Sequence, residues 1–113
     1  MKIACMNIDR LVSVQIRSNA MPRNDLGQLL KYLNQDGPVS YQIAQALLAV
    51  KRHSKVCIFT GAQDPTHYPK GESDGPLGAV AIARALEKLG HKCTIFSEEG
   101  VVAGIQGIAD AIG

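Results

Sequence analysis

The chemically richest segment of the chain is TGAQDPTHYPKGESDGPLG, residues 60–78, which lies between two apolar stretches. It contains two Asp, one Glu, one His and one Lys, together with four Gly and three Pro. Carboxylates and an imidazole can hold an ammonium group and transfer protons near neutral pH. Loops longer than about 12 residues in compact domains are more often functional or disordered, so this loop is predicted to carry the functional site.

Three side chains of the loop are candidates for catalysis: Asp64, His67 and Asp74. Histidine is the side chain that ordinarily titrates near neutral pH, so His67 is the candidate for moving protons. Each residue also has a structural interpretation, with His67 as a solvated loop residue, Asp64 as a turn residue and Asp74 as a helix N-cap. The sequence leaves both interpretations open.

The candidates for ligand binding are Gly61, Lys70, Gly75, Leu77 and Gly78. The last three lie at the predicted start of a helix, where free N–H groups can hold a carboxylate or a phosphate. Lys70 can attract a carboxylate or serve only solubility. The glycines form neither G-x-G-x-x-G nor G-x-x-x-x-G-K-[ST], so a dinucleotide or Walker-type site is not indicated.

Glu98 and Glu99 are second-rank candidates, because they follow a predicted strand and precede a predicted helix. Ligands of open α/β sheets bind beyond the carboxyl ends of the strands. Compensation of the helix dipole explains both glutamates without a function. His53 and His91 fall at helix-to-strand junctions, where a role at the helix end is favoured over catalysis.

Two short apolar runs, residues 56–60 and 92–97, predict the strands that position the loop. Continuous apolar runs of this length are typical of strands that are buried on both faces of a parallel sheet. On this prediction Cys57 and Cys93 are small core residues.

Helices are predicted after each strand. Residues 77–89 form a strongly apolar pattern with a narrow polar face, ended by Gly90, and residues 101–112 form the last helix. The order strand, helix, strand, helix predicts the α/β class, with a Rossmann-like three-layer α/β/α arrangement and a parallel sheet.

The first half of the chain is predicted to be helical. A helix is favoured over a strand for residues 7–17, although the apolar spacings are mixed. Asn24 is predicted to cap a second helix, and Pro38 suits the first turn of a third that extends to residue 50. The second helix is expected to bury a leucine stripe made of Leu26, Leu29, Leu30 and Leu33.

The chain has 113 residues, which is room for one domain. Residues 1–113 are therefore predicted to form a single α/β domain, with a helical segment at 7–52 and a β-α-β-α unit at 55–112. Two strands are few for a parallel sheet, so the domain is expected to be incomplete.

Composition excludes several classes of function. The formal net charge of +2 is too small for nucleic-acid binding, and 4% aromatic residues leave little for base stacking. No apolar run reaches the roughly 18 residues that a membrane span needs. Three widely spaced cysteines without C-x-x-C argue against a disulfide framework and a zinc site, which favours a reducing compartment, either cytoplasm or mitochondrial matrix.

The segments KVCIFTGA at 55–62 and ESDGPLGA at 72–79, with the alanine-rich stretch that follows, resemble the C-terminal domain family of D-glutamate cyclase. The similarity starts near Asn7 and covers most of the chain, but only the first part of the longer family domain. The resemblance implies a lyase that converts D-glutamate to 5-oxo-D-proline and water in the mitochondrial matrix.

This reaction needs clamps for two carboxylates, a base for the amine and an acid for the departing oxygen. Our hypothesis places a substrate carboxylate at the predicted helix start, Asp74 or Asp64 on the ammonium, and His67 as the proton carrier. Lys70 adds charge attraction. No cofactor is identified, and a divalent metal stays open because no spacing of acids and histidines marks a site.

Two alternatives to an enzyme stay open. The chain can be a non-catalytic module that binds an anion or nucleotide at the same helix start. It can also be an interaction module or homo-oligomer, because unpaired strand edges invite association. The expected partner is otherwise the small molecule D-glutamate, with no nucleic acid and no membrane.

Overall fold

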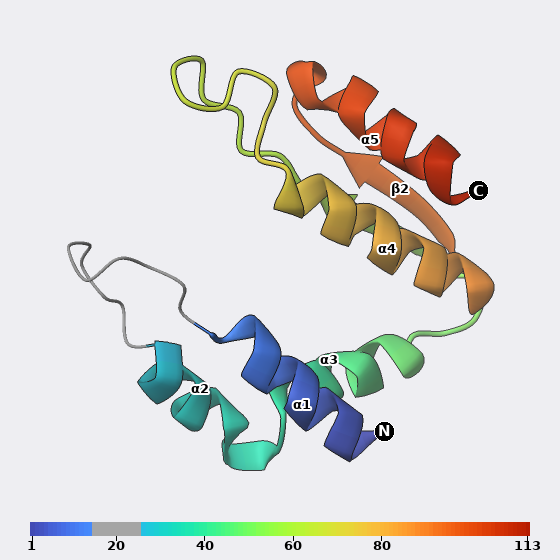
Figure 1. Ribbon diagram of the computed structural model, residues 1–113. Coiled ribbons are helices and arrows are strands. Elements are labelled where there is room, and N and C mark those ends of the chain that lie inside the picture. Colours follow the sequence, from blue (N-terminus) through green and yellow to red (C-terminus); the bar gives the residue numbers. More distant parts are fainter. Residues whose placement is uncertain (15–25) are drawn as a thin grey trace. The chain divides into compact units, whose positions relative to one another are not determined.

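A computed structural model describes residues 1–14 and 26–113 of the protein (Figure 1). The chain divides into two compact units, Met1–Val50 and Lys51–Gly113. In the described residues, no helix has the length and apolar character needed to cross a membrane.

The first unit is helical. Helix α1 spans Lys2–Val12, α2 spans Leu26–Leu33 and continues into the short 3-10 helix η1 at Asn34–Asp36, and α3 spans Val39–Leu48. Helix α1 packs against α3.

The start of α3 is closed by side chains from elsewhere in this unit. The Val39 N–H donates to Asn34 Oδ1 at 2.9 Å, and the Ser40 N–H donates to Asp9 Oδ1 at 3.1 Å. The Ser40 hydroxyl donates to the Cys5 carbonyl oxygen at 3.0 Å. Because Cys5 and Asp9 are both buried, these bonds join α1 to α3 in the interior of the unit.

Several predictions for this unit are corrected. The first helix begins at Lys2 rather than at residue 7, and Pro38 is the N-cap of α3 rather than part of its first turn. The burial of the leucine stripe is wrong for Leu29 and Leu33, which are about half exposed. An amphipathic pattern predicts an apolar face, but not what covers it. The predicted Asn24 cap and residues 15–17 lie outside the described residues.

The second unit consists of β1 at Lys55–Phe59, α4 at Asp74–Lys88, β2 at Lys92–Phe96 and α5 at Glu99–Ile112. The two strands pair in parallel, with Lys55 opposite Lys92 and Phe59 opposite Phe96. The α/β class and the parallel sheet are therefore confirmed.

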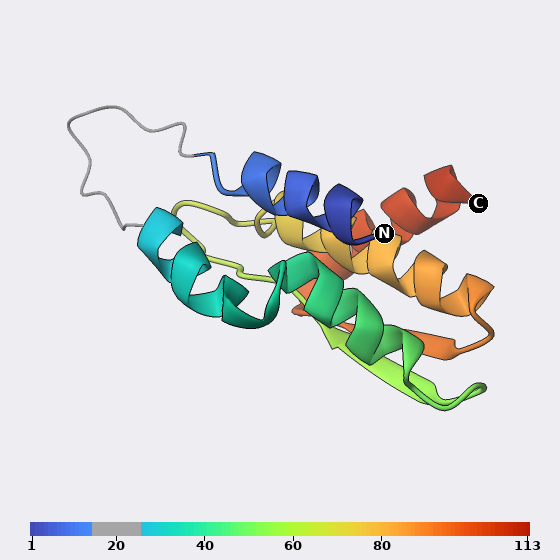
Figure 2. The same cartoon turned by 90° about the horizontal axis from the view of Figure 1, so that it is seen from below.

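The core of this unit lies between the sheet and its helices. Helices α4 and α5 contact each other and lie on the same side of the strands (Figure 2). The fully buried side chains Val80 and Leu86 come from α4, and Val101 comes from α5. Gly90, with φ +89°, ends α4 as predicted, because a glycine adopts this conformation without strain.

The prediction that both strands are buried on both faces is wrong. Burial alternates along each strand, so that Val56 and Ile58 are partly covered while Cys57 and Phe59 are exposed. Cys57 is therefore not a core residue. The Phe59 side chain is 79% exposed and stacks on Phe96 with ring centroids 5.2 Å apart.

The solvent-exposed face of α4 is also wider than predicted. Leu77, Ile82 and Leu89 are about half exposed, in addition to the charged residues of this helix. Small and apolar residues lie on every side of this helix, so the sequence could not show which face is buried.

Candidate functional site

The loop between β1 and α4 folds into a compact turn at its tip. Asp64 and Tyr68 form an antiparallel bridge, in which each backbone N–H donates to the other residue's carbonyl oxygen at 3.1 and 2.9 Å. Inside this bridge, Asp64 Oδ1 accepts the N–H groups of Thr66 and His67 at 2.9 and 2.7 Å. A carboxylate that bonds the backbone two and three residues ahead fixes a turn locally.

The same carboxylate oxygen orients His67. The Nδ1 atom of His67 lies 3.0 Å from Asp64 Oδ1. A histidine that donates from Nδ1 to a carboxylate keeps Nε2 as its free, basic nitrogen. The backbone N–H of His67, then that of Thr66, then the His67 side chain hold the pKa of Asp64 below its ordinary value. Both side chains are well exposed, at 51% for Asp64 and 74% for His67.

Helix α4 begins three residues earlier than the sequence predicted. Asp74 is its first helical residue, and the N-cap is Ser73, which makes no side-chain capping bond. The interpretation of Asp74 as the N-cap is therefore wrong, because Ser73 already has helical dihedral angles.

This earlier start changes which N–H groups are free. The first intrahelical bond goes to the N-cap carbonyl, so the N–H groups of Leu77 and Gly78 belong to the pattern of the helix itself. Within residues 1–14 and 26–113, the N–H groups of Asp74 and Gly75 have no hydrogen-bond partner, and Pro76 has no N–H group. A Cβ built on Gly75 would lie 2.8 Å from Thr60 Oγ1, so this glycine lets α4 start close to the end of β1.

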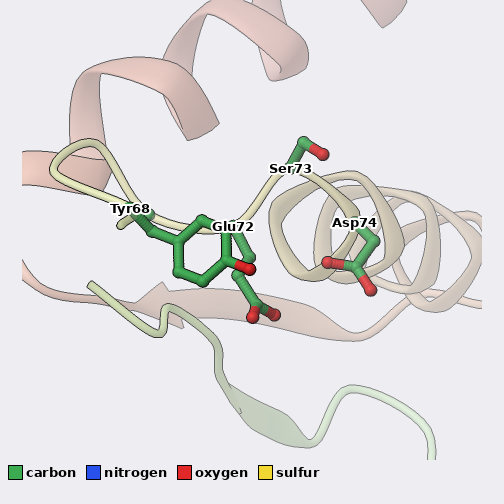
Figure 3. A pocket seen from close by; sticks show the side chains of 5 residues that line it. Tyr68, Glu72, Ser73 and Asp74 are labelled. Carbon is green, nitrogen blue, oxygen red and sulfur yellow. The ribbon is translucent and has the colours of Figure 1, made fainter. Parts of the chain in front are cut away.

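A pocket of about 390 Å³ lies where the loop enters α4. Its lining residues are Tyr68, Gly71, Glu72, Ser73 and Asp74. Figure 3 shows the Asp74 and Glu72 carboxylates and the Tyr68 ring turned to the same side, whereas the Ser73 hydroxyl points away. The pocket therefore offers two carboxylates and a phenol hydroxyl to a ligand.

The electrostatic character of this pocket is negative. Glu72 and Asp74 each carry a carboxylate, and none of the residues that line the pocket is basic. Both carboxylates are exposed, so solvent weakens their attraction for a cation but does not change its sign. This lining therefore suits a cationic group such as a primary ammonium better than a second carboxylate.

The start of α5 supports the first part of the loop. Glu98 Oε1 accepts the N–H of Ala62 at 3.2 Å and that of Gln63 at 3.4 Å. A Cβ on Gly61 would overlap Glu98 Oε2, so this glycine leaves room for the Glu98 carboxylate in its present position, and its φ of +152° is one that other residues rarely adopt. The N–H groups of Glu98 itself, Ala62 and Gln63 hold the pKa of Glu98 below its ordinary value.

Two further contacts tie the loop to α5. The Gln63 side chain donates to the Pro69 carbonyl oxygen at 2.8 Å, and a Cβ on Gly100 would lie 2.5 Å from Gln63 Nε2. A Cβ on Gly71 would lie 2.6 Å from Val101 Cγ2, and Gly71 has φ +81°. These glycines thus let the loop lie directly on the first turn of α5.

A match to a family model shows to which protein family the chain belongs. The model of the family described as D-glutamate cyclase-like, C-terminal, matches residues 30–111. The chain belongs to the D-glutamate cyclase-like C-terminal family. No curated protein matches it, and no solved structure does. The matched residues of this D-glutamate cyclase-like chain include the whole loop and the pocket.

The structure of this D-glutamate cyclase-like chain brings some predicted site residues together and not others. Asp64 and His67 are in contact at the tip of the loop, and Asp74 lies in the pocket. Tyr68 connects the two places, because its backbone pairs with Asp64 while its side chain lines the pocket. Lys70 is exposed and makes no ion pair within residues 1–14 and 26–113.

Tyr68 and Glu72, which line the pocket, were not among the residues predicted for the site, and the contact of Glu98 with the loop was not predicted. A local signal existed for Tyr68 and Glu72, which flank Lys70 in the same polar loop as Asp74. No local signal existed for the contact of Glu98 with Ala62, because these residues are 36 positions apart.

In the part of the chain that the structure describes, no group of three or more His, Cys, Asp or Glu residues is placed to hold a metal ion. Burial, and then the negative charge of Glu87, raise the pKa of the Cys93 thiol. A raised pKa keeps this thiol protonated and a weak nucleophile.

Proposed function

We propose that this chain carries a D-glutamate cyclase site, which converts D-glutamate to 5-oxo-D-proline and water. The main support is the family match over residues 30–111, which spans the loop and the pocket. The negatively charged pocket beside an Asp64–His67 pair is the second support, because it offers a place for an ammonium group next to a proton carrier.

The reaction joins the two ends of one small molecule. The amine nitrogen attacks the γ-carboxyl carbon, a C–N bond forms, and a C–O bond breaks. The ammonium loses two protons on the way to the amide N–H, and both protons end on the oxygen that departs as water. The site must therefore hold the ammonium, move two protons and fix both carboxylates.

The pocket is the proposed ammonium site. Asp74 and Glu72 provide the carboxylates, with the Tyr68 hydroxyl as a further polar contact. Asp74 is the first residue of α4, so its position is fixed by the helix. Asp64 is not part of the pocket lining, and its role is to orient His67.

His67 is the proposed proton carrier. Its contact with Asp64 leaves Nε2 free to accept a proton from the amine and to return it to the departing oxygen. Because the pair is well exposed, water weakens the electrostatic effect of its charges on a bound substrate.

The substrate carboxylates are assigned to cationic and backbone groups. Lys70 is an exposed cation on the same loop, and Gly75 contributes a free N–H group at the start of α4. Gly61 lies at the end of β1 next to this helix start. Leu77 and Gly78 contribute the exposed surface of the first turns of α4 rather than N–H groups.

The direct test is proton NMR of the purified chain with D-glutamate and, separately, with L-glutamate. Each substrate is incubated with and without a divalent metal, and the signals of 5-oxoproline are followed. Product from D-glutamate alone supports the proposal. A folded sample that gives no product in any arm contradicts it for this chain.

A matched pair of variants locates the proton carrier. His67→Asn removes the imidazole beside Asp64, whereas His53→Asn removes an exposed imidazole elsewhere in the same unit. Product formation is expected to fall about a hundredfold in His67→Asn, in line with general acid–base catalysis. It is expected to stay unchanged in His53→Asn. Equal losses in both variants would contradict the role of His67.

An interaction module is the second candidate, favoured by the exposed side of the sheet. Phe59 and Phe96 stack on each other there without burial, and the described residues pair neither strand on its outer edge. Exposed apolar surface and free strand edges favour association between copies. Sedimentation at increasing concentration tests this candidate, and a strictly monomeric chain would exclude it.

A further inference from the structure

Two backbone N–H groups at the end of β1 point at one acceptor. The N–H groups of Ala62 and Gln63 both donate to Glu98 Oε1, at 3.2 and 3.4 Å. The second carboxylate oxygen of Glu98 lies over Gly61, in the space that a Cβ would fill. The backbone of residues 61–63 thus forms a cradle with the shape of a carboxylate group.

The backbone conformation of this cradle is unusual. Ala62 has φ +82°, which non-glycine residues rarely adopt, and Gly61 has φ +152°. Successive N–H groups turned to one side by such dihedral angles make a concave anion site. A left-handed alanine is strained, and such strain often marks a functional site.

The carboxylate now in the cradle is exposed to solvent. The bond of Glu98 to Gln63 is longer than the usual range of up to about 3.2 Å. Glu98 is the N-cap residue of α5, yet its side chain makes no capping bond to that helix. The Ser97 hydroxyl also donates to Glu98 Oε2, at 3.3 Å. All of these bonds are exposed to solvent, so an external carboxylate can compete with Glu98 for the cradle.

We propose that the N–H groups of Ala62 and Gln63 bind a carboxylate of the substrate, and that Glu98 occupies this site as a displaceable internal ligand. The identity of the ligand as D-glutamate rests on the proposed function, whereas the carboxylate class follows from the group already seated there.

The position of the cradle fits a two-ended substrate. The pocket is lined by Glu72 and Asp74, which repel a carboxylate and attract the ammonium. The cradle lies near the start of α4, since a Cβ on Gly75 would be 3.7 Å from the Gly61 carbonyl oxygen. The ammonium group of D-glutamate thus lies at the pocket carboxylates, and one of its carboxylates lies at the N–H groups of the cradle.

The test is a titration of the isotope-labelled chain with D-glutamate, followed by amide NMR and by the carboxyl carbon signal of Glu98. The amide signals of Ala62 and Gln63 are expected to shift on binding. The Glu98 carboxyl signal is expected to move to the position of a free glutamate side chain. The proposal is overturned if these three signals stay fixed while the signals of Glu72 and Asp74 saturate.

Variants test the displacement separately. Glu98→Ala empties the cradle, so the Kd for D-glutamate is expected to fall about tenfold, as when a competing bound state is removed. Glu98→Gln keeps a neutral acceptor and is expected to give an intermediate Kd. Asp110→Ala, which removes a carboxylate from the far end of α5, is expected to leave the Kd unchanged. A Kd that rises in folded Glu98→Ala means that Glu98 is a fixed support, which overturns the proposal.

Glutarate separates this inference from the proposed reaction. It carries two carboxylates and no amine, so it probes the cradle without any possibility of cyclisation. Shifts of the Ala62 and Gln63 amides with glutarate, but no 5-oxoproline from D-glutamate, would keep the cradle and reject the reaction. Product without these shifts would keep the reaction and reject the cradle. No shift with either compound, in the parent chain and in Glu98→Ala, overturns the inference.

Discussion

The starts of α3 and α4 differ in whether side chains bond their first N–H groups. At the start of α3, the first two N–H groups are bonded by Asn34 and by the buried Asp9. At the start of α4, no side chain in the described part of the protein bonds the N–H groups of Asp74 or Gly75. One helix start is therefore closed by the protein, and the other is open beside a pocket.

This difference distinguishes a helix start that stabilises the fold, that of α3, from one that is available to a ligand, that of α4. A helix start whose N–H groups all have partners gains stability and offers nothing to a ligand. An open start keeps its partial positive charge available, and a first-turn acid such as Asp74 stabilises it without blocking it. The two helix starts are thus expected to respond in opposite ways to the loss of their carboxylates.

The largest effect is expected from Asp74→Asn. Product formation from D-glutamate should fall about a hundredfold, because the variant loses a charge that holds the ammonium in the proposed site. The free energy of unfolding should change by less than about 0.5 kcal/mol, since Asp74 makes no capping bond. Asp110→Asn is the matched control on α5. Normal turnover of Asp74→Asn would remove Asp74 from the mechanism.

The reverse result is expected from Asp9→Ala. This variant removes the buried acceptor of the Ser40 N–H, so the free energy of unfolding should fall by about 1–2 kcal/mol. Urea unfolding followed by circular dichroism at 222 nm measures the change. Asp36→Ala, an exposed aspartate of the same unit, should have almost no effect. Equal stabilities of the two variants would show that the start of α3 is not closed by Asp9.

Much of the second unit could be predicted from the sequence where the interactions are local. Short apolar runs and Gly90 predicted β1, β2 and the end of α4, because they are properties of a few neighbouring residues. The spacing of Asp64 and His67 belongs to the same class, since a carboxylate reaches the backbone three residues ahead within one turn.

Contacts between distant positions could not be predicted in this way. The exposure of Phe59 depends on which face of the sheet the helices cover, and the pattern of its strand is apolar on both faces. The bond from Ala62 to Glu98 depends on how the end of β2 meets the end of β1. In the sequence, Ala62 and Glu98 each follow a predicted strand, at the edge of the sheet where the strands end. The sequence does not show where the Glu98 side chain points.

A smaller effect is expected from a pair of glycine variants that tests how the open start is supported. Gly71→Ala places a Cβ against Val101 and strains a backbone with φ +81°, so it should lower the free energy of unfolding by about 1–2 kcal/mol. Gly78→Ala adds a Cβ in open space within α4 and should raise it by about 0.5–1 kcal/mol. Urea unfolding of both variants measures the two changes in the free energy of unfolding, which are expected to have opposite signs. Stabilisation by both would show that the loop does not rest on α5.

The smallest effect is expected from acid, and it separates the loop that leads to α4 from the start of α3 without mutation. The pKa values of Asp64 and Glu98 are lowered because the charged forms accept backbone N–H bonds. A lowered pKa means that this stabilisation is present above the unfolded pKa, about 4, and is lost as the pH falls through the folded pKa. Amide signals of Ala62 and His67 should therefore titrate with midpoints below the ordinary carboxyl values. The Val39 amide, which is bonded to the non-titrating Asn34, should show no such midpoint. Midpoints at or above the ordinary values would mean that these carboxylates do not order the loop in solution.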